Sequence, residues 1–307
     1  MDSNKNNKEQ RKQFGDNKQI NKMKKFILIT FLFFTNLTFA QKCFIFDTRP
    51  IECINRWVIL PQEDSNDLGL PYTFGYLFLD DEFNLMLQKE GIFEVDEDCI
   101  FTPTKSKKII RTKIELSKIL FAVIWEEKFS ELQVPETPSW QKSNKKPKEN
   151  AEFYFQWGYL YNAWGEHQKA LVSLMQAREL NQKIANLDRE MAFTYNSLGM
   201  YDKAIEILLP LRDKRPKDAY IYRELIFALT KSGKLKEAAF NLKHSMSVCK
   251  DKQYHGENCL NVLFQAFVED DKKIFNQYLR KARSLNKGNK KALELIKQME
   301  TEMKTKR

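Results

Sequence analysis

A period of 34 residues is the feature of this sequence that most restricts its fold. Glycine occupies three positions separated by this step, and alanine follows five residues after each glycine. The positions are Gly165, Gly199 and Gly233, and Ala170, Ala204 and Ala238. A fixed period of this length is typical of stacked supersecondary units that bury their apolar faces against one another.

Each unit reads as two helices. In the second unit we expect a first helix over residues 185–198, a turn at Gly199 and a second helix over 201–215 that Pro216 ends. Small residues are needed where the helices cross, and glycine permits the tight reversal between them. The predicted crossing residues are Gly158, Ala192, Ala170, Ala204 and Ala238, and the predicted filling residues are Trp157, Met191, Leu225, Leu174, Leu208 and Leu242.

This pattern resembles the tetratricopeptide repeat. The match is carried by Trp157, Gly158, Tyr161, Gly165, Ala170 and Ala177 in the first unit, by Tyr195, Gly199, Tyr201, Ala204 and Pro216 in the second, and by Gly233, Ala238 and Leu242 in the third. Two residues depart from the pattern: Gln182 replaces the terminal proline in the first unit, and Ser245 replaces a small apolar residue in the third. A degenerate fourth unit spans residues 256–287, with Asp270 at the turn and Phe275 at the crossing, and residues 289–303 follow as a capping helix.

The resemblance implies an α-solenoid whose first helices line a concave surface that binds a peptide or partner protein. The residues it places there are Tyr159, Phe193, Phe227 and Phe264, flanked by Arg189 and Arg223 on one side and by Asn162 and Asn196 on the other. Aromatic anchors beside arginine and asparagine are typical of such grooves. The alternative is that the aromatic side chains pack in cis against another part of the chain. Phe155 and Tyr159 replace the lysine and asparagine with which co-chaperone members of the family hold a C-terminal carboxylate.

Residues 41–133 have a different pattern. Short apolar runs are separated by turn residues, which predicts an antiparallel β-rich module. The runs cover 43–46, 56–60, 72–79, 83–88, 92–95, 109–116 and 118–124, and turn signals include Asp80-Asp81 and Glu90-Gly91. Residues 125–132 are predicted to form a short helix. Asp64, Asn66 and Gly69 start like a calcium loop, but Leu68 and Gly75 occupy the places of later ligands, so we expect no metal there.

Residues 134–150 are rich in proline and lysine, which predicts a linker in which Trp140 docks onto one of the two domains. The expected fold class is therefore α+β multidomain, with a β-rich module at 41–133, a linker at 134–150 and an all-α tetratricopeptide solenoid at 151–305. The solenoid would contain three clear repeats, a degenerate fourth and a capping helix.

The N-terminal residues resemble a bacterial secretory signal peptide. Lys24 and Lys25 precede an apolar run at 26–34, and Thr38 and Ala40 are small residues before a cut. The run is shorter than the ~20 residues that a membrane span needs, so we expect a secreted or periplasmic mature chain without a stable span. Residues 1–22 are interpreted as disordered or as lying upstream of the true start at Met23, and the signal peptide as 23–40.

The net charge bears on a nucleic-acid partner, and the cysteines bear on possible disulfides. Half of the net charge of +10 comes from residues 1–25, so the charge of the mature chain gives no ground for a nucleic-acid partner. Five cysteines occur, none in a Cys-x-x-Cys pair. Because Cys249 ends one helix and Cys259 begins the next, a disulfide between them is possible. The other candidates are Cys43–Cys53 and Cys43–Cys99.

No catalytic or phosphate-binding motif surrounds the three histidines, His167, His244 and His255. We therefore expect an exported, non-enzymatic interaction scaffold that binds a peptide or protein and has no cofactor. In a second hypothesis the β-rich module binds a small molecule or glycan and the repeats support it. In a third hypothesis the β-rich module is a hydrolase whose catalytic residues form no recognisable sequence motif.

Overall fold

The computed structural model describes residues 43–61, 71–116, 118–141 and 148–305. The predicted leader and the calcium-like loop lie outside these residues. The chain divides into two compact units, Met1–Lys145 and Lys146–Arg307, and the division falls inside the segment predicted as a linker. Each unit is described by itself.

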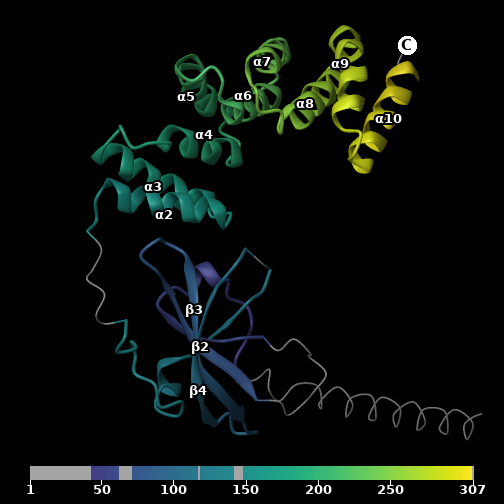
Figure 1. Cartoon of the computed structure of the whole chain (residues 1–307). Coiled ribbons are helices and arrows are strands. Elements are labelled where there is room, and N and C mark those ends of the chain that lie inside the picture. Colours follow the sequence, from purple (N-terminus) through teal and green to yellow (C-terminus); the bar gives the residue numbers. More distant parts are fainter. Residues whose placement is uncertain (1–42, 62–70, 117, 142–147, 306–307) are drawn as a thin grey trace, which may run out of the picture. The chain divides into compact units, whose positions relative to one another are not determined.

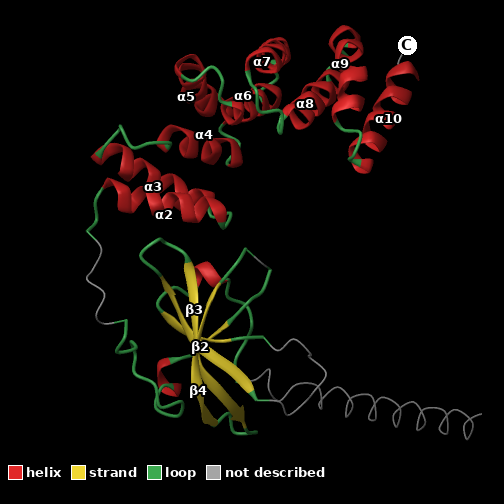
Figure 2. Ribbon diagram, viewed as in Figure 1, coloured by secondary structure: helices red, strands yellow, loops and turns green. Residues whose placement is uncertain are grey.

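The first unit is built on an antiparallel sheet, drawn in yellow in Figure 2. Its strand order is β4-β3-β2-β1-β5. Its strands and short 3-10 turns are η2 (Pro50–Glu52), β1 (Arg56–Ile59), β2 (Tyr72–Leu79), β3 (Leu85–Val95), β4 (Phe101–Lys113), β5 (Ala122–Val123) and η3 (Glu126–Lys128). The prediction of a β-rich module with antiparallel pairing is thus confirmed for this region.

Aromatic side chains fill the core of this unit. Trp57, Phe74 and Phe93 are fully buried, and Phe93 stacks on Phe101 with ring centroids 4.6 Å apart. The Trp140 ring lies 5.0 Å from that of Phe78, which confirms the docking role predicted for this tryptophan. Burial of such large apolar side chains stabilises a sheet unit of this size.

The sheet unit agrees with the sequence-based prediction at the Asp80 turn and differs from it at Gly91 and at residues 125–132. The Asp80 turn joins β2 to β3 as predicted, and the Asp80 carboxylate accepts the Asn84 N–H at 2.8 Å. The predicted turn at Gly91 is wrong, because β3 continues through it with a register shift against β4. A Cβ on Gly91 would lie 2.9 Å from the Thr104 carbonyl oxygen, so glycine is needed there for close strand approach. Of the predicted helix at 125–132, only the single turn η3 forms.

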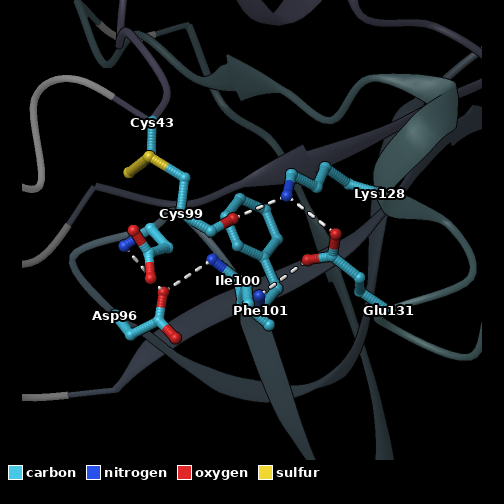
Figure 3. The surroundings of a disulfide bond; sticks show 8 residues. Cys43, Asp96, Cys99, Ile100, Phe101, Lys128 and Glu131 are labelled. Atoms are coloured by element: carbon cyan, nitrogen blue, oxygen red, sulfur yellow. Dashed lines mark hydrogen bonds and ion pairs between the residues drawn. A yellow bond between two sulfur atoms is a disulfide. The ribbon is translucent and has the colours of Figure 1, made fainter.

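A disulfide joins Cys43 to Cys99, with Cα atoms 5.3 Å apart (Figure 3). This is one of the two alternatives considered for Cys43. The predicted Cys249–Cys259 bond is not formed, since both thiols are free and buried, as is Cys53. The reason is local: Cys259 lies inside a helix, with its Sγ 3.9 Å from the Tyr278 carbonyl oxygen of the following helix, and not in the loop.

The second unit is helical (Figure 1). Its described helices are α2 (Ala151–Ala163), α3 (His167–Leu180), α4 (Leu187–Ser197), α5 (Tyr201–Lys214), α6 (Ala219–Lys231), α7 (Leu235–Val248), α8 (His255–Val268), α9 (Lys272–Leu285) and α10 (Lys290–Thr305). Within the described part of the chain, no helix combines the length and apolar character that a membrane crossing requires.

Consecutive helices pack as antiparallel pairs, α2 with α3, α4 with α5, α6 with α7 and α8 with α9, and α10 packs on α8 and α9. The turns of the first three pairs contain Gly165, Gly199 and Gly233, all with φ near +75°: 76°, 73° and 74°. Glycine adopts this left-handed conformation without the steric cost that a side chain adds. Asp270 takes the equivalent place in the fourth pair with φ 56°, so the divergent turn keeps the same backbone form.

The first helices form a continuous layer, because α2 contacts α4, α4 contacts α6, and α6 contacts α8. Among the described helices, the second members of successive pairs have at most a marginal contact with one another. A stack of helix pairs curves toward the layer whose members touch, so α2, α4, α6 and α8 form the inner side of this unit. We call this the inner layer.

Candidate protein-binding surface on the inner layer

Four aromatic side chains were predicted to line the inner layer, and the structure places one on each of its helices. Tyr159 on α2 is 55% exposed and Phe264 on α8 is 40% exposed. Phe193 on α4 and Phe227 on α6 are half-buried. The row is therefore open at its two ends and partly covered in the middle.

The two central phenylalanines pack against the second helix of the preceding pair. The Phe193 ring meets the His167 ring edge-on at 5.7 Å, and the Phe227 ring meets the Tyr201 ring in the same way at 6.1 Å. His167 and Tyr201 occupy equivalent positions in successive units. This repeated contact corrects the idea that Phe193 and Phe227 only line the surface, because they also hold neighbouring pairs together.

Arginine and tyrosine side chains alternate along the same layer. The Arg189 guanidinium lies over the Tyr220 ring at 4.4 Å, and one unit later the Arg223 guanidinium lies over the Tyr254 ring at 5.5 Å. The rings of Tyr220 and Tyr254 meet edge-on at 6.2 Å. Each arginine is thus held in place by cation–π attraction while part of its charge stays open to solvent.

The two arginines differ in their ion pairs. Arg223 is 2.6 Å from Glu224 and 3.1 Å from Glu257, so carboxylates meet it on two sides. Among the described residues, Arg189 approaches a single carboxylate within ion-pair distance, that of Asp218 at 4.0 Å, and this carboxylate lies 2.8 Å from Arg215. The buried Nε of Arg189 has no hydrogen-bond partner among the described residues. Arg189 is therefore the less neutralised of the two guanidinium groups.

Asn162 and Asn196 were predicted to flank the groove, but both are buried, at 6% and 5% exposure. The Asn162 amide donates to the Glu190 carboxylate at 3.2 Å, and the Asn196 amide donates to the Glu224 carboxylate at 2.8 Å. Each asparagine therefore links one inner helix to the next. They belong to the packing of the layer and not to its open surface.

Burial raises the pKa of both the Glu190 and the Glu224 carboxyl above the ordinary value, although amide hydrogen bonds and neighbouring arginines oppose the shift. Burial also raises the pKa of Tyr220, helped by the charges of Glu224 and Glu190. The inner layer therefore holds two acids, the half-buried Glu190 and the buried Glu224, each next in sequence to a half-buried arginine.

Sequence reasoning missed Tyr220 and Tyr254, which form the aromatic supports of the arginines. The signal was present, because these two tyrosines keep the 34-residue step. It was overlooked because Tyr220 lies in the first turn of α6 and Tyr254 immediately before α8, ahead of the residues that carry the family resemblance.

The histidines serve packing in the described part of the chain. His167 Nδ1 lies 3.3 Å from the Asn162 amide oxygen, and His244 Nδ1 lies 2.8 Å from the Tyr222 hydroxyl. His255 is buried at the start of α8. Among the described residues, no group of His, Cys, Asp or Glu is arranged to hold a metal ion.

The paired helices, the glycine turns and the continuous inner layer together define the fold of the second unit. It is a tetratricopeptide-like helical solenoid. No protein-family model matches the sequence, and no curated protein matches it.

Solved structures similar to this chain include two of MamA, designated MSR-1 and AMB-1, at 16% and 17% identity with TM-scores of 0.41 and 0.40. They cover 48% and 50% of this chain and 83% of each MamA chain. A third is TTC0263, a thermophilic TPR protein of Thermus thermophilus, at 18% identity with a TM-score of 0.37. The match covers 45% of this chain and 75% of the TTC0263 chain.

Proposed function

We propose that this chain is an exported, non-enzymatic scaffold whose inner layer binds a peptide or partner protein. The observation that carries the proposal is the exposure of Tyr159 and Phe264 at the two ends of one aromatic row. Exposed aromatic rings on a rigid helical layer are common anchors of protein interfaces, because they bury much apolar area at little entropic cost.

The arginines add directional contacts to this surface. Arg189 and Arg223 sit on fixed aromatic supports, so a partner would meet guanidinium groups that are already ordered. Pre-ordering reduces the side-chain entropy lost on binding. A partner segment with apolar side chains and at least one hydrogen-bond acceptor fits this combination of aromatic and arginine side chains.

The test compares two double variants of the full chain. Tyr159→Ala with Phe264→Ala removes the exposed inner aromatics, whereas Val172→Ala with Phe240→Ala removes exposed apolar side chains from the second helices α3 and α7. Affinity capture from envelope extracts should lose the same partner with the first variant and keep it with the second. Equal retention by both variants would contradict the proposal.

We further propose that the solenoid contains three regular repeats and a divergent fourth, α8–α9, capped by α10. Ile296 and Met299 of α10 are buried in the helical core. Removing residues 289–307 should expose that core and lower the melting temperature. An unchanged melting temperature would show that α10 does not act as a cap.

Export is supported by the leader-like residues 23–40 and by the Cys43–Cys99 bond, because disulfides persist in oxidising compartments. We expect the mature chain to begin at Gln41 in a secreted or periplasmic location. N-terminal sequencing of fractionated cells tests this, and a chain that keeps residues 26–34 would contradict it.

A further inference from the structure

A cleft of about 540 Å³ opens on the β-sheet unit, and none of its lining residues belongs to the proposed interaction surface. It lies between the start of β1, the end of β5 and the turn η3. Its lining includes two tryptophans, Trp57 and Trp125, and four ionisable side chains, Arg56, Glu126, Glu127 and Glu136. A concave site with aromatic walls and a few convergent polar groups is the usual form of a ligand site.

The backbone around the cleft is firmly held. Trp57 is buried, and its indole Nε1 donates to the Pro135 carbonyl at 2.8 Å. The Ile124 N–H donates to the Trp57 carbonyl at 3.0 Å. Trp125 follows directly, yet its side chain is 61% exposed. A large indole is thus presented to solvent from a fixed backbone, as ligand-contacting tryptophans commonly are.

The charges of the lining are unbalanced, with three carboxylates against one guanidinium. In the described part of the chain, neither Glu126, Glu127 nor Glu136 forms an ion pair. The cleft therefore carries an excess of negative charge beside an exposed aromatic ring.

The lysine nearest in sequence is already engaged elsewhere. The Lys128 ammonium lies 2.8 Å from the Glu131 carboxylate and donates to the Cys99 carbonyl at 2.6 Å (Figure 3). It also lies 5.0 Å from the centre of the Phe101 ring. Lys128 therefore stabilises the disulfide region and does not neutralise the glutamates next to it in sequence.

We propose that this cleft binds a ligand through an alkylammonium or guanidinium group, with the cation between the Trp125 ring and the cleft glutamates, Glu126, Glu127 and Glu136. Aromatic faces attract cations, and carboxylates form short charge-assisted hydrogen bonds with them. The source of the cation is a lysine or arginine side chain of a basic peptide or a free organic amine. The site is independent of the inner layer, so either proposal can fail without the other.

The experiment measures binding to the full chain by calorimetry and by the indole N–H signal of Trp125, identified by its loss in Trp125→Phe. The probes are the capped peptide Ac-Gly-Lys-Gly-Lys-Gly-amide, its glutamine counterpart, and 1,5-diaminopentane. We expect the lysine peptide to shift the Trp125 signal and the glutamine peptide to leave it unchanged. Binding of the diamine as tightly as the peptide would identify a free amine as the source of the cation.

The decisive variant is Glu126→Gln, Glu127→Gln, Glu136→Gln, which keeps side-chain size and removes the three charges. Its matched control is Glu94→Gln, Glu97→Gln, Glu115→Gln, which makes the same charge change at exposed positions of the same unit outside the cleft. Affinity for the lysine peptide should fall by about tenfold or more in the first variant and change little in the second.

Three results would overturn the proposal. The control variant could lose as much affinity for the lysine peptide as the cleft variant. The loss would then follow from the net charge of the protein and not from the cleft glutamates. The glutamine peptide could bind as well as the lysine peptide. A neutral oligosaccharide, cellotriose, could shift the Trp125 signal equally in the wild type and in the cleft variant while the lysine peptide does not, which would identify a sugar site instead.

Discussion

The side-chain amide of Asn196 donates to both the main-chain carbonyl and the carboxylate of Glu224, at 3.0 and 2.8 Å, 28 residues further along the chain. The amide of Asn162 makes the same two contacts with Glu190, at 3.4 and 3.2 Å and with the same separation. These bonds join each inner helix to the next one through buried polar atoms, and they recur with the repeat. The inner layer is therefore held together by polar side chains as well as by apolar packing.

Replacing Asn196 by alanine should destabilise the helical unit by about 1–3 kcal/mol, because the buried Glu224 carboxylate then loses a donor that water cannot replace. Urea denaturation gives the change in the free energy of unfolding. Asn276→Ala on the exposed side of α9 is the matched control and should cost much less. Equal effects in the two variants would show that the Asn196 bond contributes nothing specific.

The raised pKa values of Glu190 and Glu224 predict a pH dependence. A carboxyl whose pKa is higher in the folded than in the unfolded state holds its proton more tightly when folded. Its contribution is fully present below the unfolded pKa and is lost as pH rises through the folded pKa. The free energy of unfolding of the wild type should therefore rise, relative to that of Glu190→Gln, as the pH falls from neutral toward the ordinary glutamate pKa of about 4.3. Glu206→Gln is the control on an exposed helix position, and a parallel pH profile for Glu190→Gln and the wild type would contradict the prediction.

Phe193→Ala should lower stability by about 1–3 kcal/mol, less than the ~3–5 kcal/mol typical of a fully buried phenylalanine, because the ring is half-buried against His167. Thermal melting measures the change. Phe240→Ala, at a position 66% exposed, should be nearly neutral. A neutral Phe193→Ala would mean that the contact with His167 does not hold the helix pairs together.

Loss of the Cys43–Cys99 bond should destabilise the sheet unit. The bond spans 56 residues of chain, and the chain-entropy account gives about 4 kcal/mol for a loop of this size. The double variant Cys43→Ser, Cys99→Ser should melt at a lower temperature than the oxidised wild type. A reductant should lower the melting temperature of the wild type and leave that of the variant unchanged. Equal melting temperatures for the oxidised and the reduced wild type would contradict the expectation.

The helical unit was readable from the sequence because its geometry depends on a few residue types at fixed positions. A positive φ at Gly165, Gly199 and Gly233 and close helix crossings at Ala170, Ala204 and Ala238 leave a periodic trace. The divergent turn was harder, because Asp270 adopts the same backbone form without the glycine that marks it.

For the sheet unit, the sequence predicted the antiparallel β-rich class but not the details of strand pairing. Gly91 was interpreted as a turn because glycine often breaks a strand, and only the approach of the Thr104 carbonyl shows why a strand interior needs it. The long pairing of β3 with β4 and the partner of Cys43 depend on contacts between distant segments, which no local pattern records.

The candidate site was only partly predictable. The 34-residue step placed the aromatic row on the correct helices, but it could not separate exposed members such as Tyr159 from packed ones such as Phe193. It also could not show that Asn162 turns inward to Glu190, because both a surface and a buried asparagine keep the same register.

Site-specific photo-crosslinking tests the central claim most directly. A photoreactive phenylalanine analogue is placed in cells at Tyr159 or Phe264 of the inner layer, or at Val172 or Phe240 of the second helices, all of them exposed positions. The proposed function predicts that the two inner positions crosslink to the same discrete protein and that the two outer positions do not. Crosslinking of that protein from Val172 and Phe240 but not from Tyr159 and Phe264 would contradict the assignment of the inner layer as the binding surface.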